Sequence, residues 1–159
     1  MAVASVTETT QYLTFNLDDE VFALDISKVR EVLEFTSVTK VPKMPQYIIG
    51  VINIRGNVVP VVDMRIKFGM TEGEKTVNTC VIIVEVSVNG ETIILGALVD
   101  SVQEVIELEP ESIEPAPSIG VKLDTEFIKG MGKRDEVFII ILDIDRIFLA
   151  HDMEAMTAI

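Results

Sequence analysis

The sequence predicts an all-β protein, and three observations lead to this prediction. Apolar residues alternate with polar ones in several short runs, turn signals such as Asn89-Gly90 separate these runs, and few segments keep a helical period. Hydrophobic residues make up 48% of the chain and the mean hydropathy is +0.41, which indicates strands buried in a core. Roughly nine short strands with few helices are typical of a barrel or a sandwich.

The N-terminal part predicts a hairpin followed by a helix. Residues 1–10 are small and polar, and we expect them to form a disordered tail. Gln11–Leu17 and Glu20–Ile26 alternate polar and apolar residues around an acidic turn, as the two strands of a hairpin do. The period then changes, and apolar residues at helical spacing in Asp25–Glu34 predict a short helix with Asp25 at its start.

A second hairpin is predicted around Arg55 and Gly56. The apolar runs Gly50–Ile54 and Asn57–Met64 flank these two residues, and Gly56 can supply the positive φ that a tight turn requires. Pro60 interrupts the second run, and a proline cannot donate a hydrogen bond to a strand ladder. Its presence predicts a sheet edge or a bulge at this point.

The second half of the chain predicts one further clear hairpin and several single elements. Cys80–Asp100 holds two apolar strands around Asn89-Gly90, which is the strongest short turn signal. The other predicted segments are a polar loop at Phe68–Thr79, a strand at Val102–Leu108, an acidic loop, a turn region at 127–136, a buried strand at Val137–Ile144, a short helix at Asp143–Ala150 and a tail at 151–159.

Composition excludes several classes of function. The chain carries 13 basic and 26 acidic residues, so its net charge of −13 argues against nucleic acid and anionic membrane surfaces as partners. No apolar run reaches the roughly 18–20 residues of a membrane span, and the N-terminus lacks the basic region of a secretory signal. The single cysteine, Cys80, cannot form an internal disulfide, fits a reducing cytoplasm, and is expected to serve packing.

No catalytic motif stands out. His151 is the only histidine, which removes most schemes of histidine acid–base catalysis and most histidine-bearing metal sites. Asp143 and Asp145 could pair for acid–base work, but the favoured explanation is that they are acids at the start of a helix. Asp100 in "LVDSV" lacks the glycine of an aspartic-protease motif. The glutamates within Glu104–Glu114 lack the spacing of a calcium loop and are expected on a solvated edge.

Three stretches together resemble the CheW family, the adaptors that couple chemoreceptors to the histidine kinase CheA. They are "ALDISKVREVLEF", "VTKVPKMPQYIIGVINIRGNVVPVVDMRIKFG" and "LGALVDSVQEVIEL" with the following "IEPAP". The resemblance runs from about Gln11 to Ala150. The hallmark G-V-x-N-x-R-G-x-x-x-P-x-x-D-x-R is filled at every fixed position, by Gly50, Val51, Asn53, Arg55, Gly56, Pro60, Asp63 and Arg65. Ile54 replaces the usual leucine of this motif.

The resemblance implies a fold of two intertwined SH3-like five-stranded β-barrels around a shared core, with a few short helices. It implies a single domain over residues 11–150, with one subdomain at about 15–65 and a second at about 66–145 plus the first strand. Within the hallmark, we expect turn or structural roles for Asn53, Gly56, Pro60 and Asp63.

The resemblance also implies two protein-binding surfaces. The expected receptor-binding residues lie around a groove between the barrels and are Glu31, Val29, Gly50, Arg55 and Val105. The regulatory domain of CheA, which shares the fold, is expected to contact the end of one barrel. The sequence does not specify the kinase-binding residues, although exposed aliphatic residues between Cys80 and Leu98 are candidates.

The expected function is therefore that of a non-catalytic adaptor without cofactor or metal, monomeric when isolated. We expect it in the cytoplasm, recruited to membrane-associated receptor arrays but not inserted in the membrane. A CheW-like paralogue that modulates kinase assembly in a non-motility pathway would have the same sequence pattern. Two further hypotheses are a module that has lost receptor coupling and a small acidic hydrolase that uses paired carboxylates.

Overall fold

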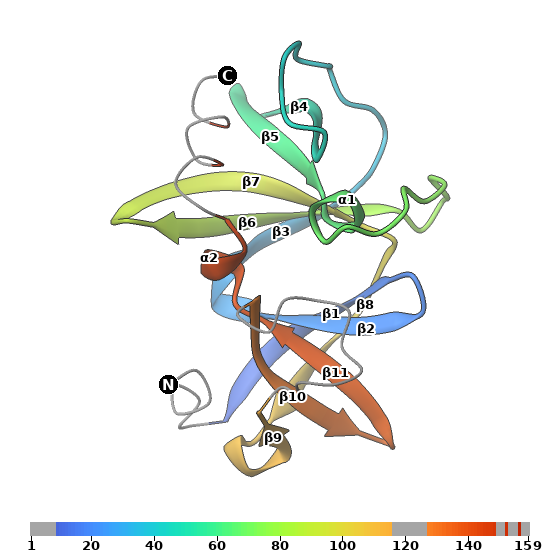
Figure 1. The fold of residues 1–159 in the computed structure, drawn as a ribbon, viewed down its shortest axis with the longest axis vertical. Coiled ribbons are helices and arrows are strands. Elements are labelled where there is room, and N and C mark those ends of the chain that lie inside the picture. The colour runs from blue at the N-terminus through green and yellow to red at the C-terminus, as the bar shows by residue number, and fades with distance from the viewer. Residues whose placement is uncertain (1–8, 116–126, 149–151, 153–155, 157–159) are drawn as a thin grey trace.

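A computed structural model describes residues 9–115, 127–148, 152 and 156, and it contains two curled β-sheets (Figure 1). The elements of the first half are β1 (Thr10–Leu17), β2 (Glu20–Asp25), the 3-10 turn η2 (Ile26–Lys28), β3 (Val29–Glu34), β4 (Ile48–Ile54), β5 (Asn57–Asp63) and α1 (Met64–Lys67). Those of the second half are β6 (Cys80–Val88), β7 (Glu91–Val99), β8 (Ser101–Leu108), η3 (Pro110–Ser112), β9 (Ile113–Glu114), β10 (Ile128–Arg134), β11 (Val137–Leu142) and α2 (Ile144–Ile147).

The two sheets are intertwined along the chain. The six-stranded sheet has the order β8-β1-β2-β11-β10-β9, and the five-stranded sheet has the order β3-β6-β7-β5-β4. The chain starts in the first sheet, builds the second completely, and then returns to the first. This arrangement confirms the predicted all-β class. The chain passes from one sheet to the other near residues 25 and 100, and β5 pairs with β7 inside the five-stranded sheet.

The core has three parts. The largest cluster of buried side chains lies between the two sheets and takes residues from both, including Phe15 and Phe22, whose rings stack with centroids 5.8 Å apart. A second cluster around Ile141 packs within the six-stranded sheet. A third cluster around Ile83 packs inside the five-stranded sheet. The two barrels therefore share one core and each keeps a smaller core of its own.

Val29–Glu34 is a strand and not the predicted helix. Asp25 does cap a helical turn, since its side chain accepts a hydrogen bond from the Ser27 backbone N–H at 2.9 Å, but that turn ends at Lys28. β3 then pairs antiparallel with β6. Long-range pairing with a buried strand outweighs the helical spacing of the local apolar residues, because most of the stabilisation of such a short segment comes from tertiary packing.

The predicted turn region at 127–136 contains strand β10 instead. The sequence pattern does not reveal this strand because it contains two glycines. Gly is unfavourable in strands unless another group approaches the backbone closely. Here a Cβ on Gly130 would lie 2.5 Å from Ile113 Cγ2, and one on Gly132 would lie 2.7 Å from Leu108 Cδ1. The glycines make room for side chains of the second buried cluster, and the true turn is limited to residues 135 and 136, which have positive φ.

The hairpin of β4 and β5 closes through a two-residue turn. Both Arg55, at φ +50°, and Gly56, at φ +87°, lie in the left-handed region, and this combination matches the twist of the flanking strands. Asn53 supports the turn, since its Oδ1 accepts a hydrogen bond from the Gly56 N–H at 2.9 Å. The predicted hairpin and the positive φ of Gly56 are confirmed.

Pro60 lies inside β5, where its missing N–H faces the gap beside β7. Pro60 is opposite Val51 of β4, but the backbone N–H and C=O of Val51 both bond to Thr39 on its other side, at 2.8 and 2.9 Å. Pro60 therefore has no ladder bond to lose toward β4. The parallel pairing of β5 with β7 begins only at Val61. The sheet edge that Pro60 predicts is therefore limited to the short stretch where β5 and β7 are not paired.

The C-terminal residues that the structure describes are buried. Asp143 begins α2, as predicted, but the helix ends at Ile147. Asp152 and Met156 fall within the expected tail at 151–159, yet both side chains are buried. Residues 1–8 of the other expected tail lie outside the described residues, and Thr10 is already part of β1. Among the residues described, no helix is long and apolar enough to cross a membrane.

Candidate functional site: an apolar groove with paired charges at its rim

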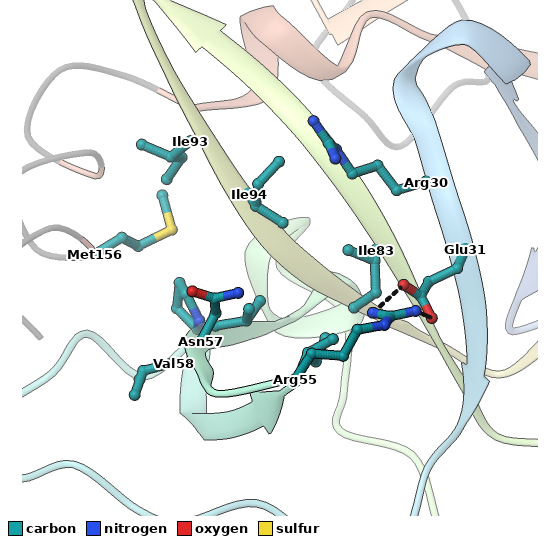
Figure 2. A pocket seen from close by; sticks show the side chains of 12 residues that line it. Arg30, Glu31, Arg55, Asn57, Val58, Ile83, Ile93, Ile94 and Met156 are labelled. Carbon is teal, nitrogen blue, oxygen red and sulfur yellow. Dashed lines mark hydrogen bonds and ion pairs between the residues drawn. The ribbon is translucent and has the colours of Figure 1, made fainter.

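A groove of about 600 Å³ opens where β5 and β7 separate (Figure 2). Its floor is apolar and comes from four strands, and its rim is charged. The lining residues are Arg30, Glu31, Ile54, Arg55, Asn57, Val58, Val59, Pro60, Ile83, Ile93, Ile94 and Met156. Pro60 lies where the groove begins, because the pairing of β5 with β7 starts only at Val61, and a proline at position 60 has no N–H to donate to β7.

Arg55 and Glu31 form a two-pronged ion pair at one end of this groove. Arg55 Nη1 donates to Glu31 Oε2 at 2.9 Å, and Nη2 donates to Oε1 at 3.2 Å. The Arg55 side chain is 71% exposed and that of Glu31 29% exposed, so the arginine presents one face to solvent while the carboxylate holds it. The hydrogen bond and the charge of Glu31 raise the pKa of Arg55.

A second ion pair extends the charged rim. Arg30 Nη2 contacts Glu85 Oε1 at 2.6 Å, between the adjacent strands β3 and β6. Isolated exposed pairs stabilise a fold very little, because both partners lose water and side-chain freedom when they meet. Their position beside an apolar floor is the feature that matters. An apolar centre with a polar rim is the usual anatomy of a protein-binding surface.

The other expected receptor residues occupy different positions. Val29 packs against the cluster between the sheets. Val105 is 48% exposed and pairs with Leu13, a member of that same cluster. Neither valine lines the groove. The structure therefore brings Glu31 and Arg55 together, while Val29 and Val105 border the junction of the two sheets.

Gly50 is buried and has a close neighbour. Its φ is +155°, and a Cβ at this position would lie 2.5 Å from the carbonyl oxygen of Thr39. The close approach allows the two backbone hydrogen bonds between Thr39 and Val51. Any contribution of Gly50 to binding must therefore act through the placement of the hairpin that carries Arg55.

The remaining charged hallmark residues hold the structure together. Arg65 binds Asp100 through Nε at 2.8 Å and Nη2 at 2.5 Å, and Asp100 also accepts the Asp18 N–H at 2.7 Å. Burial raises the pKa of Asp100, but Arg65 and the Asp18 N–H outweigh burial, so the pKa lies below its ordinary value. Asp63 caps α1 by accepting the Arg65 N–H at 3.0 Å, and burial raises its pKa.

The carboxylates considered for catalysis are engaged in structural contacts. Asp145 binds Lys28 Nζ at 2.8 Å and the Ser87 N–H at 2.8 Å. Asp143 lies 3.6 Å from Arg146 within the start of α2. Within residues 9–115 and 127–148, together with 152 and 156, no group of three or more His, Cys, Asp or Glu side chains is arranged to hold a metal ion.

Sequence reasoning missed two features of the site. The first is the groove floor: Ile93 and Ile94 fall among the expected exposed aliphatic residues between Cys80 and Leu98 without a stated position, and Ile83 is buried. The second is a partly buried cluster of Tyr47 and Lys67 around the fully buried Asp152. No local signal links Lys67 to Asp152, because the pair forms only after the C-terminal residues pack on the barrel.

The fold and the site together define a scaffold that binds other proteins. Its barrels enclose packed side chains, and a groove of about 600 Å³ combines an apolar floor with ion pairs at its rim. The comparisons with known proteins agree with this class. The family model for the CheW-like domain matches residues 11–151, and the chain belongs to this family.

Named relatives support the same assignment. The chain is 36% identical over 143 residues to the chemotaxis protein CheW of Klebsiella aerogenes, covering 90% of this chain and 84% of that protein. It is 31% identical over 145 residues to the chemotaxis protein CheW of Rhizobium meliloti, covering 91% of each. The crystal structure of the scaffolding protein TtCheW from Thermoanaerobacter tengcongensis matches with a TM-score of 0.78 and 37% identity over 90% of each chain. The protein is thus a non-catalytic scaffold of chemotaxis signalling.

Proposed function

We propose that this chain couples chemoreceptors to the histidine kinase CheA by holding both on one rigid scaffold. The observation that carries the proposal is the Arg55–Glu31 ion pair at the rim of the apolar groove. An arginine held by a carboxylate keeps a fixed orientation and retains free N–H donors for a partner. Such a residue beside apolar anchors is a typical centre of binding energy.

The receptor-facing surface includes Glu31, Arg55, Val29 and Val105, with Gly50 acting indirectly. Glu31 and Arg55 supply polar contacts, and the exposed face of Val105 supplies an apolar one. Gly50 fixes the hairpin that presents Arg55. A helical partner could place its apolar residues along the junction of the two sheets and its polar residues against the ion pair.

The kinase-facing surface is the groove floor. Family resemblance implies that the regulatory domain of CheA meets the end of one barrel, and the groove lies beside the turn where β4 ends and β5 begins. Ile93 and Ile94 belong to the Cys80–Leu98 range, are partly exposed and line it, and the buried Ile83 packs beneath. The Arg55–Glu31 pair then borders both surfaces, so that either partner can alter the position of the same two side chains. This coupling would operate in the cytoplasm, at membrane-associated receptor arrays.

The test is calorimetric titration of the purified chain against two partners separately. One is the regulatory domain of CheA and the other is a fragment of the receptor signalling tip. We expect the chain to bind both, and Arg55→Ala to weaken receptor binding by on the order of tenfold. Arg134→Ala is the matched control, since Arg134 forms a similar exposed pair with Glu104 at 3.3 Å on the other sheet.

Three results of this titration would change the interpretation. Equal losses for Arg55→Ala and Arg134→Ala would show that the effect is one of net charge and not of a specific contact. Binding to the kinase domain without any binding to the receptor fragment would show a module that serves kinase assembly alone. Binding to neither partner would contradict the proposed function.

A further inference from the structure

Met156 closes one end of the groove. Figure 2 shows its side chain at the same end as Ile93 and Val58, whereas Glu31 and Arg55 lie at the other end. Only 3% of Met156 is exposed, and it belongs to the core cluster between the sheets. One side chain therefore contributes both to the shared core and to the wall of the groove.

Asp152, located four positions earlier in the sequence, is held by a buried polar cluster. It is 0% exposed, and its Oδ2 accepts a hydrogen bond from Lys67 Nζ at 3.1 Å. The Tyr47 hydroxyl donates to Oδ1. Lys67 Nζ also lies 4.4 Å from the centre of the Tyr47 ring and 5.5 Å from that of Phe148. Burial, followed by the hydrogen bond and charge of Asp152, raises the pKa of Tyr47.

Such a cluster fixes position as well as supplying energy. A methionine on its own adapts to irregular apolar gaps and tolerates small displacements. A buried carboxylate does not, because losing its partner leaves an uncompensated charge in the interior. Asp152 therefore fixes the point at which the C-terminal part of the chain is held, through its contacts with Lys67 and Tyr47. Because this point is fixed, Met156 lies in the wall of the groove.

We propose that Asp152, held by Lys67 and Tyr47, positions Met156 as the end wall of the groove and so determines how well the groove fits its partner. Asp152 acts here as a positioning residue and Met156 as part of the binding surface. The identity of that partner, the regulatory domain of CheA, rests on the proposed function. The attachment of Met156 does not depend on it, and a separate measurement tests it.

The first measurement is thiol labelling in a Cys80→Ala background. Met156→Cys places a thiol in the wall, and Val77→Cys provides an exposed reference, since Val77 is 95% exposed and outside the groove. We expect the thiol at position 156 to react at least about a hundredfold more slowly than the reference, as a buried group that reacts only after local opening does. Adding Asp152→Asn should raise its rate by about tenfold or more, and adding Tyr47→Phe should raise it less.

Two results of the labelling would overturn the proposal. One is a thiol at position 156 that reacts as fast as the reference. The other is a slow rate that neither Asp152→Asn nor Tyr47→Phe increases, which would show that the polar cluster does not hold Met156. Tyr47→Phe keeps the test usable if Asp152→Asn fails to fold, because it removes a single hydroxyl and leaves the ion pair with Lys67 in place.

The second measurement is binding to the regulatory domain of CheA well below the melting temperature. Met156→Ala and Asp152→Asn should weaken binding by about fivefold or more, and Met156→Leu should restore most of the affinity because it keeps the volume of the wall. Glu107→Gln, an exposed charge loss on β8, should have no effect. Unchanged or tighter binding by Met156→Ala would overturn the proposal, because Met156 would then be irrelevant to the surface or would cover it.

The two measurements separate failure of this inference from failure of the proposed function. If the wild-type chain does not bind the kinase domain, the proposed partner is wrong and the labelling result still decides whether Asp152 holds Met156. If the wild type binds and the labelling shows no anchor, the coupling function stands and this inference fails.

Discussion

The guanidinium of Arg55 and the carboxylate of Glu31 join the two opposite edges of the five-stranded sheet. Glu31 belongs to β3 at one edge, and Arg55 lies in the turn after β4 at the other. Two hydrogen bonds of 2.9 and 3.2 Å span the gap between these edges. This contact joins the two sheet edges beside the groove, so the same pair contributes to the shape of the surface and to its chemistry.

Charge reversal separates these two roles. Arg55→Glu should weaken receptor binding by about tenfold or more, because it removes the donors and places two carboxylates together. The double variant Arg55→Glu with Glu31→Arg restores the ion pair in reverse. We expect it to recover the melting temperature but not the receptor affinity, as measured by calorimetry on the same preparations.

Full recovery of receptor binding in the double variant would contradict a contact role for Arg55. It would show that the receptor requires only a closed barrel edge. Arg134→Glu on the other sheet controls for the change in net charge, since Arg134 also lies opposite a glutamate.

The two glycines of the β4–β5 hairpin should differ in their tolerance of alanine. A Cβ at Gly56 meets nothing within 4 Å, so Gly56→Ala carries only the cost of a positive φ, about 1 kcal/mol. A Cβ at Gly50 would lie 2.5 Å from the Thr39 carbonyl oxygen, and we expect a loss of about 3 kcal/mol or more. Urea unfolding of both variants gives the comparison, and equal losses would contradict the close approach of Thr39 to Gly50.

Two aspartates should give opposite dependences of stability on pH. The folded-state pKa of Asp100 is lowered, so its contribution to stability is present above its unfolded value of 3.8 and is lost as the pH falls through the folded pKa. The folded-state pKa of Asp63 is raised, so its contribution is present below 3.8 and is lost as the pH rises through the folded pKa.

Asparagine substitutions test these signs. Asp100→Asn should flatten the fall in stability on acidification below about pH 4. Asp63→Asn should instead change the profile above the unfolded value of 3.8, because it removes the stability that wild-type Asp63 gains as the pH falls through its folded pKa. Asparagine at position 63 can still cap α1. Urea midpoints measured from about pH 2.5 to 7 provide the readout, and parallel profiles for wild type and Asp100→Asn would rule out a charge-stabilising role of Arg65.

Neighbouring positions in β5 should respond very differently to proline. Pro60→Ala should change the free energy of unfolding by no more than about 1 kcal/mol, because the restored N–H faces the groove and not a ladder partner. Val61→Pro should cost about 2 kcal/mol or more, since Val61 is fully buried and lies in the paired part of the strand. A large loss for Pro60→Ala would show that the proline, and not the sheet, determines where β5 and β7 separate.

Local patterns predicted the hairpins well and failed where distant residues decide the structure. The turn at Arg55-Gly56 follows from two adjacent residues, and it was predicted with the right conformation for Gly56. β3 was predicted as a helix because its partner, β6, is far away in sequence. The sequence predicts a turn at β10, because the side chains that require Gly130 and Gly132 come from other strands.

The same limit applies to the site. Sequence identified Arg55 and Glu31 singly, through family resemblance, but not the bond between them, since β3 was expected to be helical. It did not indicate the groove floor, which depends on the divergence of β5 and β7. The sequence predicts a tail at Asp152 and Met156, because burial of a few C-terminal residues depends on cavities that the rest of the chain creates.

The parallel pairing of β2 with β11 has a consequence for how the chain is made. Val21 pairs with Ile139, so the middle of the six-stranded sheet joins the start of the chain to a strand synthesised near its end. All strands of the five-stranded sheet lie between β2 and β11 in the sequence. This sheet can therefore assemble on the ribosome while the hairpin of β1 and β2 is still without β11. Contacts this distant in sequence form slowly. Until β11 arrives, one edge of β2 is open to other chains, and crowded translation is the stage at which this scaffold is most exposed to mispairing.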